Sequence, residues 1–89
     1  MKTFNDLQFK KHPMAEGLDG VVSRIFFDNG YGASVVKHQY SYGGDRGLYE
    51  LAVLDKDGQL CYTTAITNDV IGYLTEEDVE ELLIKIQQL

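Results

Sequence analysis

The chain has 89 residues and a mass of 10.0 kDa, which favours one domain and excludes two independent cores. Apolar residues make up 44% of it and charged residues 25%, a globular composition that excludes a low-complexity or disordered chain. The net charge of −6 argues against a surface that neutralises phosphates, so direct binding of nucleic acid is not expected.

Charge is distributed unevenly along the chain. Residues 1–46 contain six Lys or Arg and five Asp or Glu, whereas residues 47–89 contain two and nine. This acidic half either keeps the protein in solution, which is the simpler interpretation, or faces a basic partner. The carboxylates near its end are Asp69, Glu76, Glu77, Asp78, Glu80 and Glu81.

Cellular location is predicted from cysteine usage and from apolar runs. Cys61 is the only cysteine, which excludes an intrachain disulfide and fits a reducing compartment. Asp6, Lys10 and Lys11 interrupt the beginning of the chain, so it lacks the apolar run of a secretory signal. No stretch approaches the roughly 18 apolar residues of a membrane span. We therefore expect a cytoplasmic protein with no membrane partner.

Residues 1–20 mix charges with one proline and two glycines, and their structure is left open, with Leu7–Phe9 as the only strand-like fragment. Residues 21–27 are β-branched and aromatic, which predicts a strand. Asp28-Asn29-Gly30 then predicts a tight turn, because Asn-Gly tolerates positive φ angles. Residues 31–40 continue as an extended segment, so the two runs are expected to form an antiparallel hairpin.

Further strands follow at short intervals. Residues 41–47 contain three glycines and predict a loop, and residues 48–54 predict a third strand. Residues 55–59 (DKDGQ) predict a turn, and residues 60–67 (LCYTTAIT) a fourth strand. Residues 68–74 are expected to be a connection with room for one helical turn.

The end of the chain predicts a helix over residues 75–89. Thr75 and Asp78 have the spacing of a capping box, although Asp reaches less far than Glu or Gln. Acidic residues in the first turns favour the helix dipole. One apolar stripe follows at helical spacing, formed by Val79, Leu82, Leu83 and Ile86.

The predicted fold is therefore α+β, with a four-stranded antiparallel meander sheet and one C-terminal amphipathic helix on one face. One helix covers one face only, yet the chain has six Tyr and four Phe. Some of these rings must lie on the other face or at an edge, where either the N-terminal segment or another chain covers them. A homodimer is thus an open alternative.

Metal, cofactor and catalytic sites are not predicted. His12 and His38 have no Cys or carboxylate at metal-ligand spacing. His38 is interpreted as a surface or edge residue or, alternatively, as a ligand contact or an acid–base group. Asp55-x-Asp57-Gly58 resembles a calcium loop, but Leu60 stands where an EF-hand needs glycine, so a hairpin turn explains it better. Cys61 lacks a neighbouring base and is expected to act as a small core residue.

The residues best suited to binding surround the glycine-rich loop. Tyr offers rigid apolar area with a polar tip, and Arg offers a planar set of donors, and both are enriched at binding hot spots. The simpler interpretation of these tyrosines is that they are half-buried strand residues. Residues 30–32 and 43–47 weakly resemble phosphate-binding glycine loops, and the simpler interpretation there is that the glycines only form turns. The predicted binding residues are Tyr31, His38, Tyr40, Tyr42, Asp45, Arg46 and Tyr49, with Ser41 among them.

Three short motifs follow one another: Asn-Gly-Tyr-Gly at residues 29–32, Ser-Tyr-Gly-Gly at 41–44 and Gly-Leu-Tyr-Glu at 47–50. Cys61-Tyr62 and residues 66–74 (ITNDVIGYL) come after them. With these motifs the chain resembles a group of small uncharacterised proteins of tailed bacteriophages, over most of its length after residue 20. The resemblance implies a phage-encoded accessory protein in the infected cytoplasm, and it carries no enzymatic activity and no catalytic residue.

Three functions are compatible with these observations. The first is a small non-enzymatic protein that binds and modulates a host or phage protein through the tyrosine and glycine loop. The second is an acidic decoy that occupies a nucleic-acid-binding site with the carboxylates of residues 69–81. The third is a small-molecule binder or enzyme that uses His38, Tyr42 and Arg46.

Overall fold

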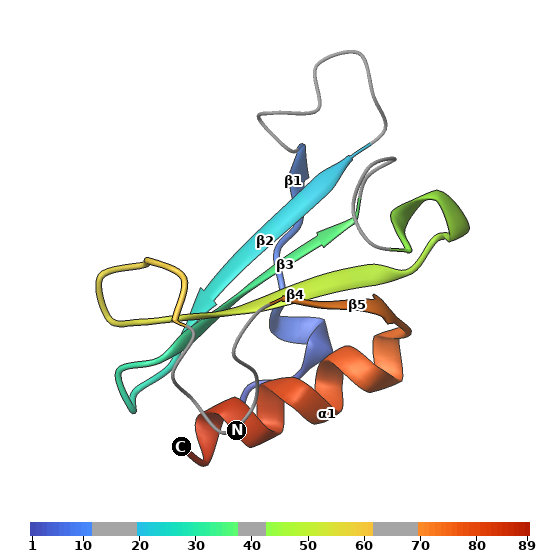
Figure 1. Ribbon diagram of the computed structural model, residues 1–89. Helices are drawn as coiled ribbons and strands as arrows, with labels where there is room; N and C mark the ends of the chain where they lie inside the picture. Colours follow the sequence, from blue (N-terminus) through green and yellow to red (C-terminus); the bar gives the residue numbers. More distant parts are fainter. Residues whose placement is uncertain (12–19, 38–42, 62–69) are drawn as a thin grey trace.

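The computed structural model describes residues 1–11, 20–37, 43–61 and 70–89. Within these ranges the protein is an antiparallel sheet with one long helix across a single face (Figure 1). Five strands neighbour one another in chain order as a meander: β1 (Lys10–Lys11), β2 (Val21–Phe26), β3 (Gly32–Lys37), β4 (Tyr49–Leu54) and β5 (Ile71–Leu74). The long helix is α1 (Glu76–Gln87), and η1 (Phe4–Asp6) and η2 (Gly44–Arg46) are single 3-10 turns.

The predicted fold class is confirmed, and the predicted number of strands is wrong. The structure has an antiparallel sheet and a C-terminal helix, but the described residues contain five strands rather than four. Three of the five match predicted strands, and most of the predicted fourth strand lies outside the described residues. The two strands that were not predicted, β1 and β5, are short and lie at the two edges of the sheet. β1 consists of two exposed lysines, Lys10 and Lys11, which pair with Val22 and Val21. Lysines at the edge of a sheet protect it from pairing with another chain, but they lack the apolar pattern by which a strand is predicted from sequence.

The predicted hairpin is confirmed as β2 and β3. Phe26 pairs with Gly32 and Val21 with Lys37, so the register holds along both strands. The loop has three residues: Phe27 N donates to Tyr31 O at 2.8 Å, and Gly30 takes a φ of 89°, which favours glycine. Residues 38–40, the end of the predicted second strand, lie outside the described residues.

The predicted third strand and the turn after it are also confirmed. β4 begins one residue later than predicted, and η2 lies within the predicted loop at 41–47. Asp55 Oδ1 accepts hydrogen bonds from the backbone N of Asp57 and Gln59, at 2.9 and 3.0 Å, which closes the turn. Of the predicted fourth strand, Leu60 forms a bridge with Leu54, and residues 62–67 lie outside the part of the chain described.

β5 lies where the sequence predicted a connection, and that expectation is wrong for Ile71–Leu74. Tyr49 pairs with Leu74 and Leu51 pairs with Ile71, so β5 has one residue more than β4 between these pairs. This bulge includes Tyr73, whose φ is 57°. Because of the bulge, Ile71 and Leu74 face the same side of a strand although they have the spacing of a helical face.

The predicted capping box begins α1. Asp78 N donates to Thr75 Oγ1 at 3.1 Å, and Thr75 N donates to Asp78 Oδ2 at 3.0 Å. The predicted stripe is confirmed at Val79, Leu83 and Ile86, whose side chains are fully buried, whereas Leu82 is only partly buried. The helix therefore packs three of its four stripe residues on the sheet.

The core lies between α1 and one face of the sheet. Alternate residues of the three central strands point toward it, as a half-buried sheet requires. Together with the helix they exclude water from an apolar layer, and most of its members are fully buried. The strand residues of this layer are Ile25, Ala33, Val35, Leu51 and Val53.

The N-terminal segment shares this face with α1. Leu7 is buried in the core, and Phe4 and Phe9 pack against it. Gln87 ties the beginning of the chain to the end of the helix: Lys2 N donates to its Oε1 at 2.8 Å, and its Nε2 donates to Lys2 O at 2.7 Å. The two termini accordingly lie together (Figure 1). Leu7–Phe9, the strand-like fragment of a segment whose structure the sequence left open, does not form a strand.

Candidate protein-binding surface

The predicted binding residues do not form one cluster among the residues described. Tyr31 precedes β3 and Tyr49 begins β4, at opposite ends of an antiparallel pair in which Gly32 faces Leu54. At roughly 3.3 Å per residue, the backbone positions of these two tyrosines lie about 20 Å apart along the sheet. Arg46 is exposed in η2, and Asp45 contributes its backbone to the same turn. The remaining members, His38, Tyr40, Ser41 and Tyr42, lie outside the described residues.

Tyr49 belongs to an aromatic cluster. Its ring centroid lies 5.6 Å from that of Phe4, edge to face, and 5.6 Å from that of Phe9. Lys37 Nζ stands 4.8 Å from the centre of the same ring, on the neighbouring strand. Tyr49 is thus a half-buried strand residue that the N-terminal segment covers, which is the simpler of the two interpretations given for the tyrosines.

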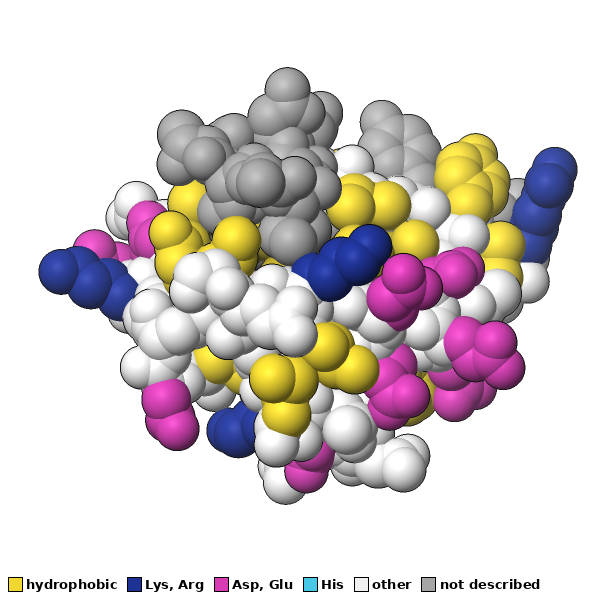
Figure 2. Space-filling model, turned by 90° about the horizontal axis from the view of Figure 1, so that it is seen from below, with side chains coloured by type: hydrophobic (Ala, Val, Ile, Leu, Met, Phe, Trp, Pro, Cys, Tyr) yellow, Lys and Arg dark blue, Asp and Glu magenta, His cyan; other side chains and the backbone are white. Residues whose placement is uncertain are grey.

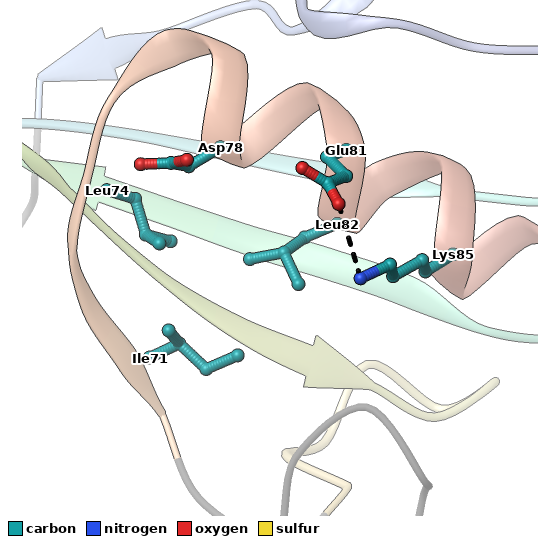
Figure 3. Close-up of a pocket in the computed structure, with 6 residues that line it drawn as sticks. All are labelled: Ile71, Leu74, Asp78, Glu81, Leu82 and Lys85. Carbon is teal, nitrogen blue, oxygen red and sulfur yellow. Dashed lines mark ion pairs between the residues drawn. The ribbon is translucent and has the colours of Figure 1, made fainter.

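A groove runs between β5 and α1. It has a volume of about 220 Å³ and is lined by Ile71, Leu74, Asp78, Glu81, Leu82 and Lys85. Figure 3 shows Leu82 projecting from the helix toward Ile71 and Leu74, while the charged side chains stand along the helix above them. The groove therefore has an apolar floor and a charged rim.

The rim of the groove is mainly acidic. Glu81 pairs with Lys85 one helical turn away, with 3.4 Å between Oε1 and Nζ, and both side chains are more than half exposed. Asp78 belongs to the capping box, and hydrogen bonds from the backbone and side chain of Thr75 lower its pKa from the ordinary value of 3.8. The Asp78 carboxylate is consequently ionised at neutral pH.

The acidic rim continues around the beginning of α1. Figure 2 shows acidic side chains gathered at this end of the helix face, next to apolar ones. On the other side of the helix, Glu76, Glu77 and Glu80 line a second hollow of about 170 Å³ together with Phe4 and Asn5. Glu80 Oε1 accepts a hydrogen bond from Phe4 N at 3.3 Å. α1 thus presents five carboxylates and one lysine, with a hollow on either side.

The groove was missed from the sequence, although one signal for it was available. Leu82 is part of the predicted apolar stripe, and helical spacing alone does not indicate which stripe residue stays partly open to solvent. Its partners Ile71 and Leu74 were assigned to a connection, so nothing placed them beside the helix. Only the β-bulge brings both of them to the helix side of the sheet.

A third hollow, of about 360 Å³, lies at the hairpin end of the sheet, and Tyr31 and Cys61 line it with Asn29, Gly30, Asp55 and Lys56. No group of His, Cys, Asp and Glu side chains among the described residues could hold a metal ion. Within the same ranges, no helix has the length and apolar character required to cross a membrane.

Comparison with protein-family models, with curated proteins and with solved structures found no match for this chain.

Proposed function

We propose that this chain is a small non-enzymatic protein that binds another protein through the acidic surface around α1. The observation that carries the proposal is the placement of the helix carboxylates. Five of them project from one exposed helix, beside a groove with an apolar floor. A water-excluding apolar centre with charges at its rim is the usual composition of a protein interface. The acidic rim favours a basic partner, because complementary charge steers and orients association.

The phage-type role remains part of the proposal, and its support is the motif pattern of residues 29–50. On this view the chain is an accessory protein that modulates a host or phage protein by occupying a basic surface. An acidic decoy would use the same carboxylates, and it differs in one respect: its partner must lose nucleic acid when it is captured.

The test is gentle capture of the tagged protein from bacterial lysate, followed by native mass spectrometry. We expect an added basic protein whose abundance falls at about 1 M salt, where the Debye length shrinks to roughly 3 Å. The paired substitutions Glu76→Gln and Glu77→Gln should weaken the capture. They spare Glu80, which holds the N-terminal segment, and Glu81, which pairs with Lys85.

The control removes the same amount of charge elsewhere. Asp28 and Asp57 are exposed in the turns at the hairpin end of the sheet, so Asp28→Asn with Asp57→Asn should leave the capture unchanged. Equal loss in both double variants would show that net charge alone attracts the partner. Undiminished capture by the glutamine variant would contradict the proposal, and so would the absence of any captured protein.

A further inference from the structure

We propose that the groove between β5 and α1 receives one large aliphatic side chain from a basic segment of the partner protein. This inference rests on the proposed function and deepens it, because it states what the partner must carry. The partner segment has a leucine-like residue for the floor of the groove, and lysine or arginine on either side of it for the rim.

The floor is an apolar surface that the chain leaves partly open to solvent. Val79, Leu83 and Ile86 bury their side chains fully, whereas Leu82, in the same stripe, remains partly exposed. Ile71 is also partly exposed and lies across from it (Figure 3). The groove has a volume of about 220 Å³, which leaves room for a leucine side chain with its four carbons.

The rim selects the charge of the segment. Asp78 and Glu81 stand above the floor, and Lys85 is the only cation among the described residues that line the groove. The Glu81–Lys85 pair is exposed and therefore weak, so a cation of the partner can replace Lys85 as the companion of Glu81. α1 as a whole carries five carboxylates and one lysine. This excess of negative charge repels an acidic segment.

The same charge disfavours a second copy of this chain as the occupant. A two-fold dimer places the same patch on both partners, so the two acidic rims would face each other. A basic segment of another protein satisfies both the apolar floor and the acidic rim. Charge complementarity therefore decides between the two occupants.

The experiment titrates the full chain with two synthetic decapeptides that differ in one residue. Both are lysine-rich, and the central residue is leucine in one and serine in the other. We expect the leucine peptide to bind at least about ten-fold more tightly, because burial of one leucine accounts for a difference of this order. When this peptide binds, the methyl NMR signals of the protein that shift should be those of Ile71, Leu74 and Leu82.

Two variants on the same helix show whether the groove is responsible. Leu82→Ser should abolish the preference for the leucine peptide, whereas Ile84→Ser, a partly exposed position that does not line the groove, should preserve it. Far-UV circular dichroism confirms that each variant is folded, and Ile71→Ser repeats the test from the strand side. A third decapeptide with glutamate in place of lysine should not bind.

The outcomes separate this inference from the proposed function. Equal affinity for the leucine and serine peptides, with no methyl shift at Ile71, Leu74 or Leu82, would overturn the groove and leave the acidic surface intact. Binding of the glutamate peptide as tightly as the lysine peptide would overturn the charge selection. If neither lysine peptide bound at low ionic strength, the groove and the acidic surface would both be rejected. Concentration-dependent dimerisation that Leu82→Ser abolishes would assign the groove to a second copy instead.

Discussion

Leu83→Ala tests whether α1 is held on the sheet by its apolar stripe. Leu83 is fully buried in the core between the helix and the strands. The substitution removes three carbons, worth about 0.8 kcal/mol each, and leaves a cavity that adds to the loss. We expect the free energy of unfolding to fall by about 3 to 4 kcal/mol. A chain of 89 residues has a total of roughly 4 to 13 kcal/mol, so the loss is a quarter of it or more.

The assay is urea unfolding at neutral pH, followed by far-UV circular dichroism and by tyrosine fluorescence. The matched control is Leu89→Ala at the end of the chain, where the side chain is 40% exposed, and its effect should stay within about 0.5 kcal/mol. A loss below about 1 kcal/mol for Leu83→Ala would show that the stripe does not pack on the sheet, and the two-layer fold would be refuted.

Three other substitutions probe the helix cap and the N-terminal segment. Thr75→Ala removes the acceptor of the Asp78 N–H and should cost about 1 kcal/mol in urea unfolding, while an unchanged midpoint would contradict the cap. The hydrogen bonds from Thr75 lower the pKa of Asp78 in the folded protein below the ordinary value of 3.8. The ionised carboxylate therefore stabilises the fold fully at pH values well above 3.8, and this stabilisation is lost as the pH falls through the lowered pKa of the folded state. Asp78→Asn should therefore destabilise the protein at neutral pH and lessen the fall in stability below pH 3.8, and a parallel pH profile would argue against this role. Phe4→Ala removes a ring that contacts Tyr49, so it should lower the free energy of unfolding by about 2 kcal/mol and alter the near-UV circular dichroism of tyrosine. An unchanged stability together with an unchanged near-UV signal would show that the N-terminal segment does not cover the sheet.

Features encoded by neighbouring residues were predictable. The loop between β2 and β3 needs a residue with positive φ, and Gly30 supplies it. The capping box needs Thr75 and Asp78 three residues apart, and both hydrogen bonds form. In each case the energy comes from groups within one turn, so the sequence pattern is sufficient to indicate the structure.

The edges of the sheet depend on contacts between distant residues. β1 is made of Lys10 and Lys11, which have no strand signal and are held by backbone pairing with β2. β5 needs a bulge that puts Tyr73 at positive φ, an unfavourable conformation that pairing with β4 offsets. Local propensity therefore predicts a connection, and the tertiary pairing overrides it.

The composition and the local patterns alone determined that this chain is acidic and has an α+β fold with a central hairpin and a capped, amphipathic C-terminal helix. They also determined which residues are charged, and hence that α1 has an acidic surface. Only the tertiary structure decided what lies beside that surface. It placed Tyr31 and Tyr49 at opposite ends of the sheet and brought Ile71 and Leu74 under Leu82. The physical reason is that strand pairing and a bulge, which join residues far apart in the sequence, set these distances.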